Sequence, residues 1–141
     1  MNVLIAEDPA AEVAGRLARA AEAGAHIALT GGSSPGKAYE KAAELGADWS
    51  GATLWWGDER CVAPDDELSN YSMAKRTLLD RLPSGDAGPA VKRIRGEAGP
   101  YGAADDYERE LRETLGEGIR QALLRDPTYG PALRSARSML R

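Results

Sequence analysis

Short apolar segments alternate with longer stretches of helical periodicity along the first hundred residues of this chain. Strands are predicted at residues 3–5, 26–30, 53–56 and 91–95, and an amphipathic helix is predicted after each of them. Strands that alternate with helices of ten or more residues are typical of βαβ units and of a parallel sheet. The sequence therefore predicts an α/β fold with an open, mostly parallel, Rossmann-like sheet. Right-handed crossovers would place helices on both faces, in three layers.

The strand signal stops after about four strands, as if the sheet were truncated. Beyond Arg95 the sequence has no valine and a single isoleucine, and residues 119–141 hold five arginines and one aspartate. We expect residues 1–118 to form a partial α/β domain and residues 119–141 to be an atypical Arg-rich tail. Two interpretations of the tail stand: a helix such as 118–125 followed by disordered residues, or the product of a shifted reading frame.

Composition excludes several classes of protein. The 141 residues carry a formal net charge of −4, which argues against a nucleic-acid-binding surface. The apolar runs are far shorter than the roughly 20 residues of a membrane span, and no signal peptide is visible. One cysteine, Cys61, and one histidine, His26, exclude a disulfide framework and a multi-histidine metal site. The prediction is a cytoplasmic protein that binds neither nucleic acid nor membrane.

A glycine- and serine-rich turn follows the second predicted strand and consists of Gly31, Gly32, Ser33 and Ser34. Glycines let the backbone turn tightly and let a ligand approach it. Ser34 is predicted to cap the next helix, with Pro35 at the first helical position. The free N–H groups of that first turn, with Lys37 as a further donor, favour a phosphate. The alternative is an ordinary strand-to-helix turn with a capping serine.

The same turn overlaps the beginning of a P-loop. Gly31 to Lys37 reads G-x-x-x-x-G-K, but the next residue is Ala38 where a P-loop needs the Mg²⁺-binding hydroxyl of serine or threonine. A P-loop-like nucleotide binder is therefore a weaker alternative.

A charged turn follows the third predicted strand and consists of Asp58, Glu59 and Arg60 after Gly57. An arginine there can grip a phosphate or carboxylate, or stabilise a developing oxyanion. The carboxylates could hold the arginine or orient a polar substrate. Adjacent charges are more often a solvated surface cluster. The glycine turn at the end of a parallel strand favours a functional role, because ligands bind at that edge of open α/β sheets.

These segments together resemble the 6-phosphogluconolactonase family. The matching pieces are residues 29–35, residues 56–62 and Ser69-Asn70-Tyr71, with a weaker match at 95–97. The resemblance covers about residues 1–118, the N-terminal portion of the family. The related glucosamine-6-phosphate deaminase/isomerase branch would be expected to show Asp-Glu-Tyr at positions 58–60, so the lactonase branch is favoured.

The resemblance implies hydrolysis of 6-phospho-D-glucono-1,5-lactone to 6-phosphogluconate, a step of the oxidative pentose phosphate pathway. It implies no metal or organic cofactor. The glycine turn would hold the sugar phosphate and Arg60 the anionic substrate, with Asp58 and Glu59 shaping the site. The substrate-binding residues implied in this way are Gly31, Gly32, Ser33, Ser34, Asp58, Glu59, Arg60 and Asn70. The role of Asn70 is unassigned.

The resemblance leaves the catalytic base unassigned. In the family the base is thought to be a histidine in a later Gly-Pro-Asp-Gly-His-Thr-Ala-Ser segment, and this sequence has no such segment. His26 begins the second predicted strand, away from its functional end, and is expected to be structural. The chain is then an inactive truncated or frame-shifted product, half of an assembly with another chain, or an enzyme in which Glu59 replaces the base.

Two further expectations follow. A non-catalytic sugar-phosphate-binding remnant would be stabilised by its ligand without turning it over. An unpaired sheet edge, left where later strands are missing, predicts self-association.

Overall fold

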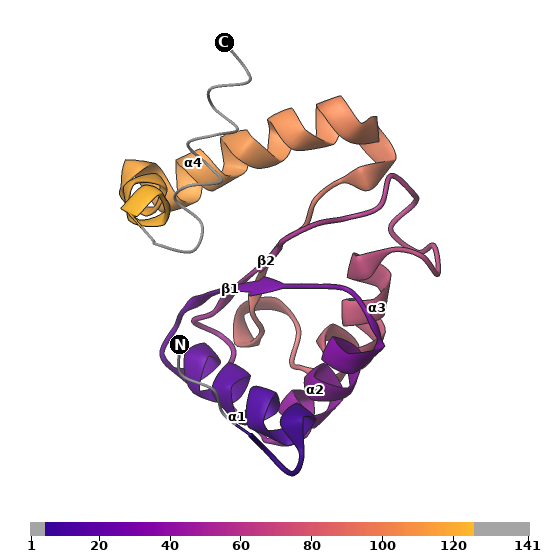
Figure 1. Cartoon of the computed structure of the whole chain (residues 1–141), viewed down its shortest axis with the longest axis vertical. Coiled ribbons are helices and arrows are strands. Elements are labelled where there is room, and N and C mark those ends of the chain that lie inside the picture. Colours follow the sequence, from indigo (N-terminus) through magenta and orange to yellow (C-terminus); the bar gives the residue numbers. More distant parts are fainter. Residues whose placement is uncertain (1–4, 126–141) are drawn as a thin grey trace. The chain divides into compact units, whose positions relative to one another are not determined.

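The computed structural model describes residues 5–125 of the chain, and the side chains of residues 5–116 (Figure 1). The chain divides into two compact units, Met1–Ala104 and Asp105–Arg141, and each is described by itself. The strand predicted at residues 3–5 falls almost entirely outside the described residues, as do residues 126–141 of the predicted tail. The first unit contains the sheet and both predicted motifs.

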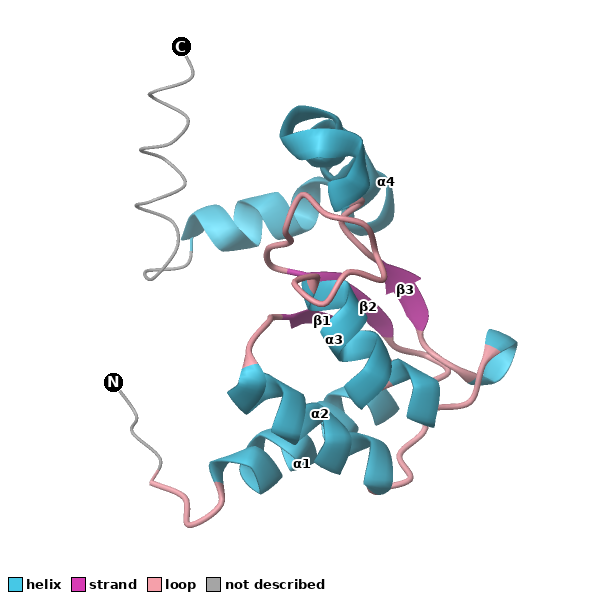
Figure 2. Ribbon diagram, turned by 90° about the vertical axis from the view of Figure 1, so that its right-hand side faces the viewer, coloured by secondary structure: helices cyan, strands magenta, loops and turns pink. Residues whose placement is uncertain are grey.

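Three parallel strands form the sheet of the first unit, in the order β1-β2-β3 (Figure 2). β1 spans His26–Leu29, β2 spans Thr53–Trp56 and β3 spans Ala90–Lys92. The three predicted strands that fall on described residues are confirmed, and β3 ends three residues before its predicted limit. The α/β class and the parallel sheet are confirmed with them.

Helices precede β1 and connect the strands. α1 spans Pro9–Glu22, and its N-cap is Asp8, which accepts a hydrogen bond of 3.0 Å from the N–H of Ala11. α3 spans Asn70–Thr77 and is followed by a short 3-10 turn at Leu79–Arg81. The Asp8 cap and the proline that follows it agree with the sequence prediction.

The beginning of α2 differs from the prediction. α2 spans Ser33–Glu44, so Ser34 lies inside its first turn and is not its cap. The N-cap is Gly32, which has no side chain to donate or accept and has a φ of +108°. Glycine adopts that conformation readily, so the chain enters the helix before the serine that was expected to cap it.

One face of the sheet carries the hydrophobic core, where apolar strand residues pack against all three helices. The core residues of the strands are Ile27, Leu29, Leu54 and Trp56, and those of the helices and adjoining segments include Ala14, Ala21, Tyr39, Ala42, Ala74 and Leu78. The strand order follows the chain order, so two crossovers of the same hand place α2 and α3 on the same face. Helices α1 to α3 therefore form one of the two predicted helical layers (Figure 2).

The opposite face of the sheet is less covered in the described chain. His26 and Ala28 on this face are exposed, whereas Trp55 is 4% exposed. Adjacent Trp55 and Trp56 lie on opposite faces, as the alternation of a strand requires. Trp56 packs edge-to-face on Tyr71 with ring centroids 5.5 Å apart.

α4 spans Gly99–Arg125 and confirms the predicted fourth helix. Gly116, with a φ of +64°, breaks its helical geometry, so two helical segments meet there. Ion pairs join Arg109 to Asp106 and Arg112 to Glu108 along the exposed side of the first segment. No helix in residues 5–125 is long and apolar enough to cross a membrane.

Candidate functional site

The two predicted motifs meet at the carboxyl ends of β1 and β2. The N–H of Gly57, just after β2, donates a hydrogen bond of 2.9 Å to the carbonyl of Leu29 at the end of β1. Thr30, the next residue, is held by the buried Tyr39 of α2, whose hydroxyl donates to its carbonyl and accepts from its N–H, both at 2.9 Å. Burial raises the pKa of the Tyr39 hydroxyl above its ordinary value. These contacts fix the points at which the chain leaves β1 and β2.

Asn70, the first residue of α3, joins the two motifs. Its side chain is 6% exposed, and its Nδ2 donates to the carbonyl of Asp58 at 3.0 Å. The same amide packs against Gly31, where an added Cβ would lie 1.8 Å from Asn70 Oδ1. Gly31 is therefore required for close packing of the asparagine. This contact gives Asn70 a role that sequence reasoning left unassigned.

The carboxylate of Glu59 holds the beginning of α3, and we call this set of contacts the Glu59 clamp. Oε1 accepts from the N–H groups of Arg60 and Asn70, both at 2.7 Å. Oε2 accepts from the hydroxyl of Ser69 at 3.0 Å and from the N–H of Tyr71 at 2.8 Å. Four donors match the roughly four lone-pair positions of a carboxylate. Glu59 is thus fully occupied as an acceptor and has no free position from which to activate water.

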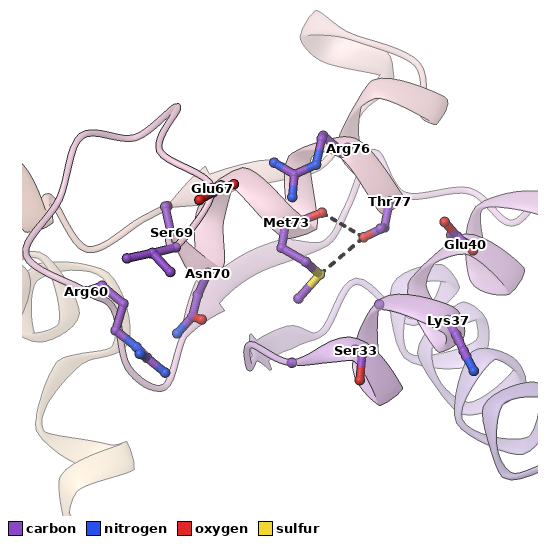
Figure 3. Close-up of a pocket in the computed structure, with 13 residues that line it drawn as sticks. Ser33, Lys37, Glu40, Arg60, Glu67, Ser69, Asn70, Met73, Arg76 and Thr77 are labelled. Atoms are coloured by element: carbon purple, nitrogen blue, oxygen red, sulfur yellow. Dashed lines mark hydrogen bonds between the residues drawn. The ribbon is translucent and has the colours of Figure 1, made fainter.

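A pocket of about 550 Å³ opens beside these motifs, between α2 and α3 (Figure 3). Four of the predicted substrate-binding residues line it: Gly32, Ser33, Arg60 and Asn70. The other four, Gly31, Ser34, Asp58 and Glu59, do not. The remaining lining residues come from α2, the loop before α3 and α3 itself: Gly36, Lys37, Glu40, Glu67, Leu68, Ser69, Met73, Arg76 and Thr77.

Three of the lining residues are cations from three different elements. Lys37 comes from α2, Arg60 from the turn after β2 and Arg76 from α3 (Figure 3). Within residues 5–116 none of the three has a carboxylate within ion-pair distance. Arg76 is held by a neutral group, since its Nη1 donates to Ser72 Oγ at 2.6 Å. The pocket thus brings together three cations that form no ion pair within the described side chains.

The pocket also contains two carboxylates. Glu40 lies 3.5 Å from Arg81 Nη2, so part of its charge is neutralised outside the pocket. Glu67 is exposed on the loop before α3. The first turn of α2 has no side-chain cap, which leaves the N–H groups of Ser33 and Ser34 available. The polar groups at the beginning of α2, the two N–H groups and the Lys37 ammonium, are therefore hydrogen-bond donors suited to an anion, whereas Glu40 adds an acceptor farther along the helix.

Sequence reasoning missed Arg76 as a candidate residue. The available signal was Ser72, four residues before the arginine, a spacing that lets a hydroxyl hold a guanidinium on one helix face. That pattern also describes an ordinary solvated helix face. Only the placement of α2 beside α3 shows that Arg76 lines the same pocket as Lys37.

The weakly matching segment at residues 95–97 packs against the backbone of the charged turn. A Cβ added at Gly96 would lie 2.0 Å from the carbonyl oxygen of Arg60, so only glycine fits against that turn. Glu97 pairs with Arg93, which lies 5.4 Å from the ring centroid of Tyr71. The Arg93 guanidinium lowers the pKa of the Glu97 carboxyl to about 2.

Other candidates take no part in the pocket. His26 begins β1, and its Nδ1 accepts a hydrogen bond of 3.0 Å from Trp55 Nε1, which agrees with the structural role predicted for it. Cys61 is exposed. In the described part of the chain no group of three or more potential ligands could hold a metal ion.

The local geometry argues against the P-loop alternative. The four residues between the two glycines of the motif should form a loop around a phosphate chain, but α2 already begins at Ser33. Ala38, in the place of the Mg²⁺-binding hydroxyl, is 2% exposed and packs in the helix interface. Neither the loop nor the metal ligand of a P-loop is therefore present.

Comparisons with known proteins agree with the motifs. A family model described as glucosamine-6-phosphate isomerases/6-phosphogluconolactonase matches residues 3–125. A 6-phosphogluconolactonase of Aggregatibacter actinomycetemcomitans is 34% identical over 101 residues, which cover 67% of this chain and 42% of the relative. One from Streptomyces coelicolor is 35% identical over 119 residues, which cover 77% of this chain and 45% of the relative.

The fold has solved counterparts as well. The crystal structure of a 6-phosphogluconolactonase from Thermotoga maritima is similar, with a TM-score of 0.64 and 28% identity over 79% of this chain and 53% of that one. The chain thus spans less than half the length of these two curated relatives and about half of the solved structure.

Proposed function

The chain belongs to the family of glucosamine-6-phosphate isomerases and 6-phosphogluconolactonases, and from this premise we propose that it serves the hydrolysis of 6-phosphogluconolactone in the cytoplasm. Its own contribution is the substrate-binding part of the lactonase site. The observation that carries this proposal is the pocket between α2 and α3, where Lys37, Arg60 and Arg76 have no carboxylate partner in the described chain.

The pocket suits a phosphate at the end nearest the sheet. Gly32 lets the ligand approach the backbone, and Ser33 adds a hydroxyl and an N–H at the uncapped beginning of α2. Arg60 can bind a phosphate through two parallel hydrogen bonds. The Asp58 carboxylate is exposed at the same edge and has no partner in residues 5–116, which favours contact with sugar hydroxyls.

Two of the predicted residues act through others in this proposal. Gly31 makes room for Asn70, and the Glu59 clamp sets the position of Arg60 and of the first turn of α3. Both are positioning residues. Glu59 is not assigned as the base, because its four acceptor positions are filled by backbone and hydroxyl donors.

The reaction itself needs little from the protein beyond orientation and charge. A water oxygen adds to the lactone carbonyl carbon, the bond from that carbon to the ring oxygen breaks, and the ring oxygen takes a proton. The acid that forms then ionises. Donors aimed at the developing oxyanion and a base for the attacking water accelerate these steps. We assign no described residue as that base.

The test is lactonase turnover by the purified 141-residue chain on fresh 6-phosphogluconolactone, measured against spontaneous hydrolysis. Turnover above background that Arg60→Ala abolishes and Arg19→Ala preserves would support a complete site. Arg19 is a matched control, since it is an exposed arginine of α1 outside the pocket. Background turnover with no stabilisation by 6-phosphogluconate would contradict the proposal.

A non-catalytic sugar-phosphate-binding protein is the second candidate. The observation that favours it is the combination of a cationic pocket with a fully occupied Glu59. In that case 6-phosphogluconate raises the melting temperature of the wild type but not of Arg60→Ala, and turnover stays at background.

Self-association through a sheet edge completes the proposal. β1 and β3 are the outer strands of the described sheet, and Val91 of β3 is 39% exposed. Exposed edge strands can pair with another chain. Sedimentation over a range of concentrations should show a dimer or larger species that Val91→Lys reduces, and a monomer at every concentration would contradict this part.

A further inference from the structure

The outer edge of β1 carries backbone groups that the described sheet does not use. In a parallel sheet, alternate residues of a strand turn both their N–H and their C=O toward the same neighbour. The carbonyl of Leu29 accepts from the N–H of Gly57, so Leu29 faces β2. His26, Ala28 and Thr30 therefore turn their backbone groups to the other side, where no described strand pairs with β1.

Tyr39 closes this edge at its carboxyl end. Its hydroxyl donates to the carbonyl of Thr30 and accepts from the N–H of the same residue, both at 2.9 Å. A further strand can therefore pair with β1 only before Thr30. The carbonyl of His26 and the N–H of Ala28 remain, and one residue of a parallel neighbour can donate to the first and accept from the second.

A second pocket, of about 590 Å³, lies along the same edge. Its apolar walls include Val13 and Leu17 of α1, Leu29 of β1 and Ala38 of α2. Val13 is 44% exposed and Leu17 is half-buried, so α1 leaves part of its apolar face uncovered. An apolar segment that filled this pocket would remove that surface from water.

α1 has the position of a crossover helix, although no described strand precedes it. It packs on the same face of the sheet as α2 and α3 (Figure 2). Asp8 and Pro9, at the beginning of α1, line the second pocket together with Leu29 and Thr30, at the carboxyl end of β1. A strand that led into α1 along this edge would therefore run parallel to β1. A right-handed crossover from that strand to β1 places α1 on the face where it lies.

We infer that residues 3–5, Val3-Leu4-Ile5, form a fourth parallel strand on the outer edge of β1. These residues are apolar and two are β-branched, as is typical of a buried strand. The structure describes the last of them, Ile5, which is 92% exposed. Only residues 6–8 separate the segment from α1, an ordinary length for a connection from a strand to a helix.

The two open backbone groups of β1 fix the register. Leu4, the middle residue of the segment, donates its N–H to the carbonyl of His26 and accepts from the N–H of Ala28. It then lies opposite Ile27, whose side chain is in the core on the helical face. Side chains of paired residues share a face, so the Leu4 side chain fills the second pocket. The fourth strand is independent of the proposed lactonase site, and it leaves β3 as the edge for self-association.

The test is amide hydrogen exchange of the full chain, followed by NMR residue by residue. We expect the N–H of Ala28 to exchange at least about tenfold more slowly than an unprotected amide. Leu4→Pro removes the donor to His26 and should abolish the protection of Ala28, whereas Leu29, which faces β2, should keep its own. The protection of Ala28 should be the same at low and high protein concentration, because the contact lies within one chain.

A matched pair of milder variants keeps the test decisive if Leu4→Pro fails to fold. Leu4→Asn leaves the pocket without its apolar occupant and should lower both the protection of Ala28 and the urea midpoint. Leu45→Asn, which replaces a 56% exposed leucine at the end of α2, should change neither.

Three results would overturn the inference. The first is exchange of Ala28 at the unprotected rate in the wild type, which would leave the edge open. The second is protection that survives both substitutions at Leu4, which would assign the edge to another segment. The third is protection that increases with protein concentration, which would place a second copy of the chain there.

Discussion

Two helices begin at the same edge of the sheet, and their first turns are treated in opposite ways. α2 begins after Gly32, which offers no side chain, so its first N–H groups have no side-chain acceptor. α3 begins after Ser69, whose hydroxyl accepts from Ser72 N–H, while the Glu59 carboxylate accepts from Asn70 and Tyr71. The protein itself satisfies the beginning of α3 and leaves the beginning of α2 open.

The difference separates a turn that the chain itself completes from a turn that binds a ligand in our proposal. Both helix N-termini attract negative charge for the same physical reason. At α3 the negative charge belongs to the chain, and its effect is to fix the helix. At α2 no described side chain caps the helix, and the ligand of our proposal would supply the charge. A polar motif at the end of a parallel strand thus does not by itself identify a ligand contact. In the motif with more charges, residues 58–60, the Glu59 carboxylate binds the protein backbone and fixes α3.

The largest expected effect is the loss of the Glu59 clamp. Glu59→Ala removes the acceptor of four donors, and we expect it to lower the free energy of unfolding by about 3 kcal/mol. Urea unfolding followed by tryptophan fluorescence measures this change. Glu67→Ala is the matched control, an exposed glutamate with no partner in residues 5–116, and should change it by less than about 0.5 kcal/mol. Equal effects of the two variants would show that the clamp does not stabilise α3.

The contact between the two turns gives the next effect. Gly31→Ala places a Cβ 1.8 Å from Asn70 Oδ1 and must displace the asparagine. We expect a destabilisation of about 1–3 kcal/mol, as for other overpacked sites. Gly15→Ala in α1 is the control, where the nearest atom is Arg19 Nη1 at 3.4 Å, and it should be neutral or stabilising. A neutral Gly31→Ala would show that the two turns are not in contact.

Removal of single hydroxyls at the two helix starts compares them directly. Ser69→Ala removes the α3 cap and should cost about 1 kcal/mol. Ser33→Ala removes the hydroxyl of the first residue of α2, which is not a cap, and should cost less than about 0.5 kcal/mol. The urea midpoints of the two variants measure these losses of stability. A larger loss for Ser33→Ala than for Ser69→Ala would contradict the comparison of the two helix starts.

The smallest effect is a pH dependence from the ion pair that supports Tyr71. The pKa of Glu97 is about 2 in the folded chain against an ordinary value of 4.5, so the ionised form is favoured by folding. Its contribution to stability is present above about pH 4.5 and is lost as pH falls through 2. Because the Glu97 side chain is 38% exposed, solvent screening limits the contribution to about 0.5 kcal/mol.

The measurement is the difference in stability between the wild type and Glu97→Gln at pH 6 and at pH 2. The difference should shrink toward zero at the lower pH. A difference that stays constant between the two would mean that Glu97 is not the titrating group.

The sequence sufficed for the strands that begin both motifs. His26–Leu29 and Thr53–Trp56 combine β-branched or aromatic residues with turn signals at their ends, and these local signals survive packing. The two motifs lie at the same edge of the sheet because the two strands are parallel neighbours. The placement of α2 and α3 on one face depends on the order of the strands, which no local signal carries.

The site was predictable only in part, for a similar reason. Residue types identified Gly32, Ser33 and Arg60, which line the pocket. They could not distinguish Glu59, which binds the backbone of a helix that begins eleven residues later, from a carboxylate aimed at a ligand. No sequence pattern pointed to Arg76, because it lines the pocket only through the packing of α3 beside α2. The assignment of residues 119–141 as a tail remains a prediction.

The packing of Gly31 against the Asn70 amide restricts the order in which these two positions can change over generations. A larger residue at position 31 collides with the asparagine, whereas a shorter residue at position 70 leaves the glycine undisturbed. Drift at this pair therefore has a direction: position 70 must change first. We therefore expect relatives that keep the asparagine to keep the glycine as well.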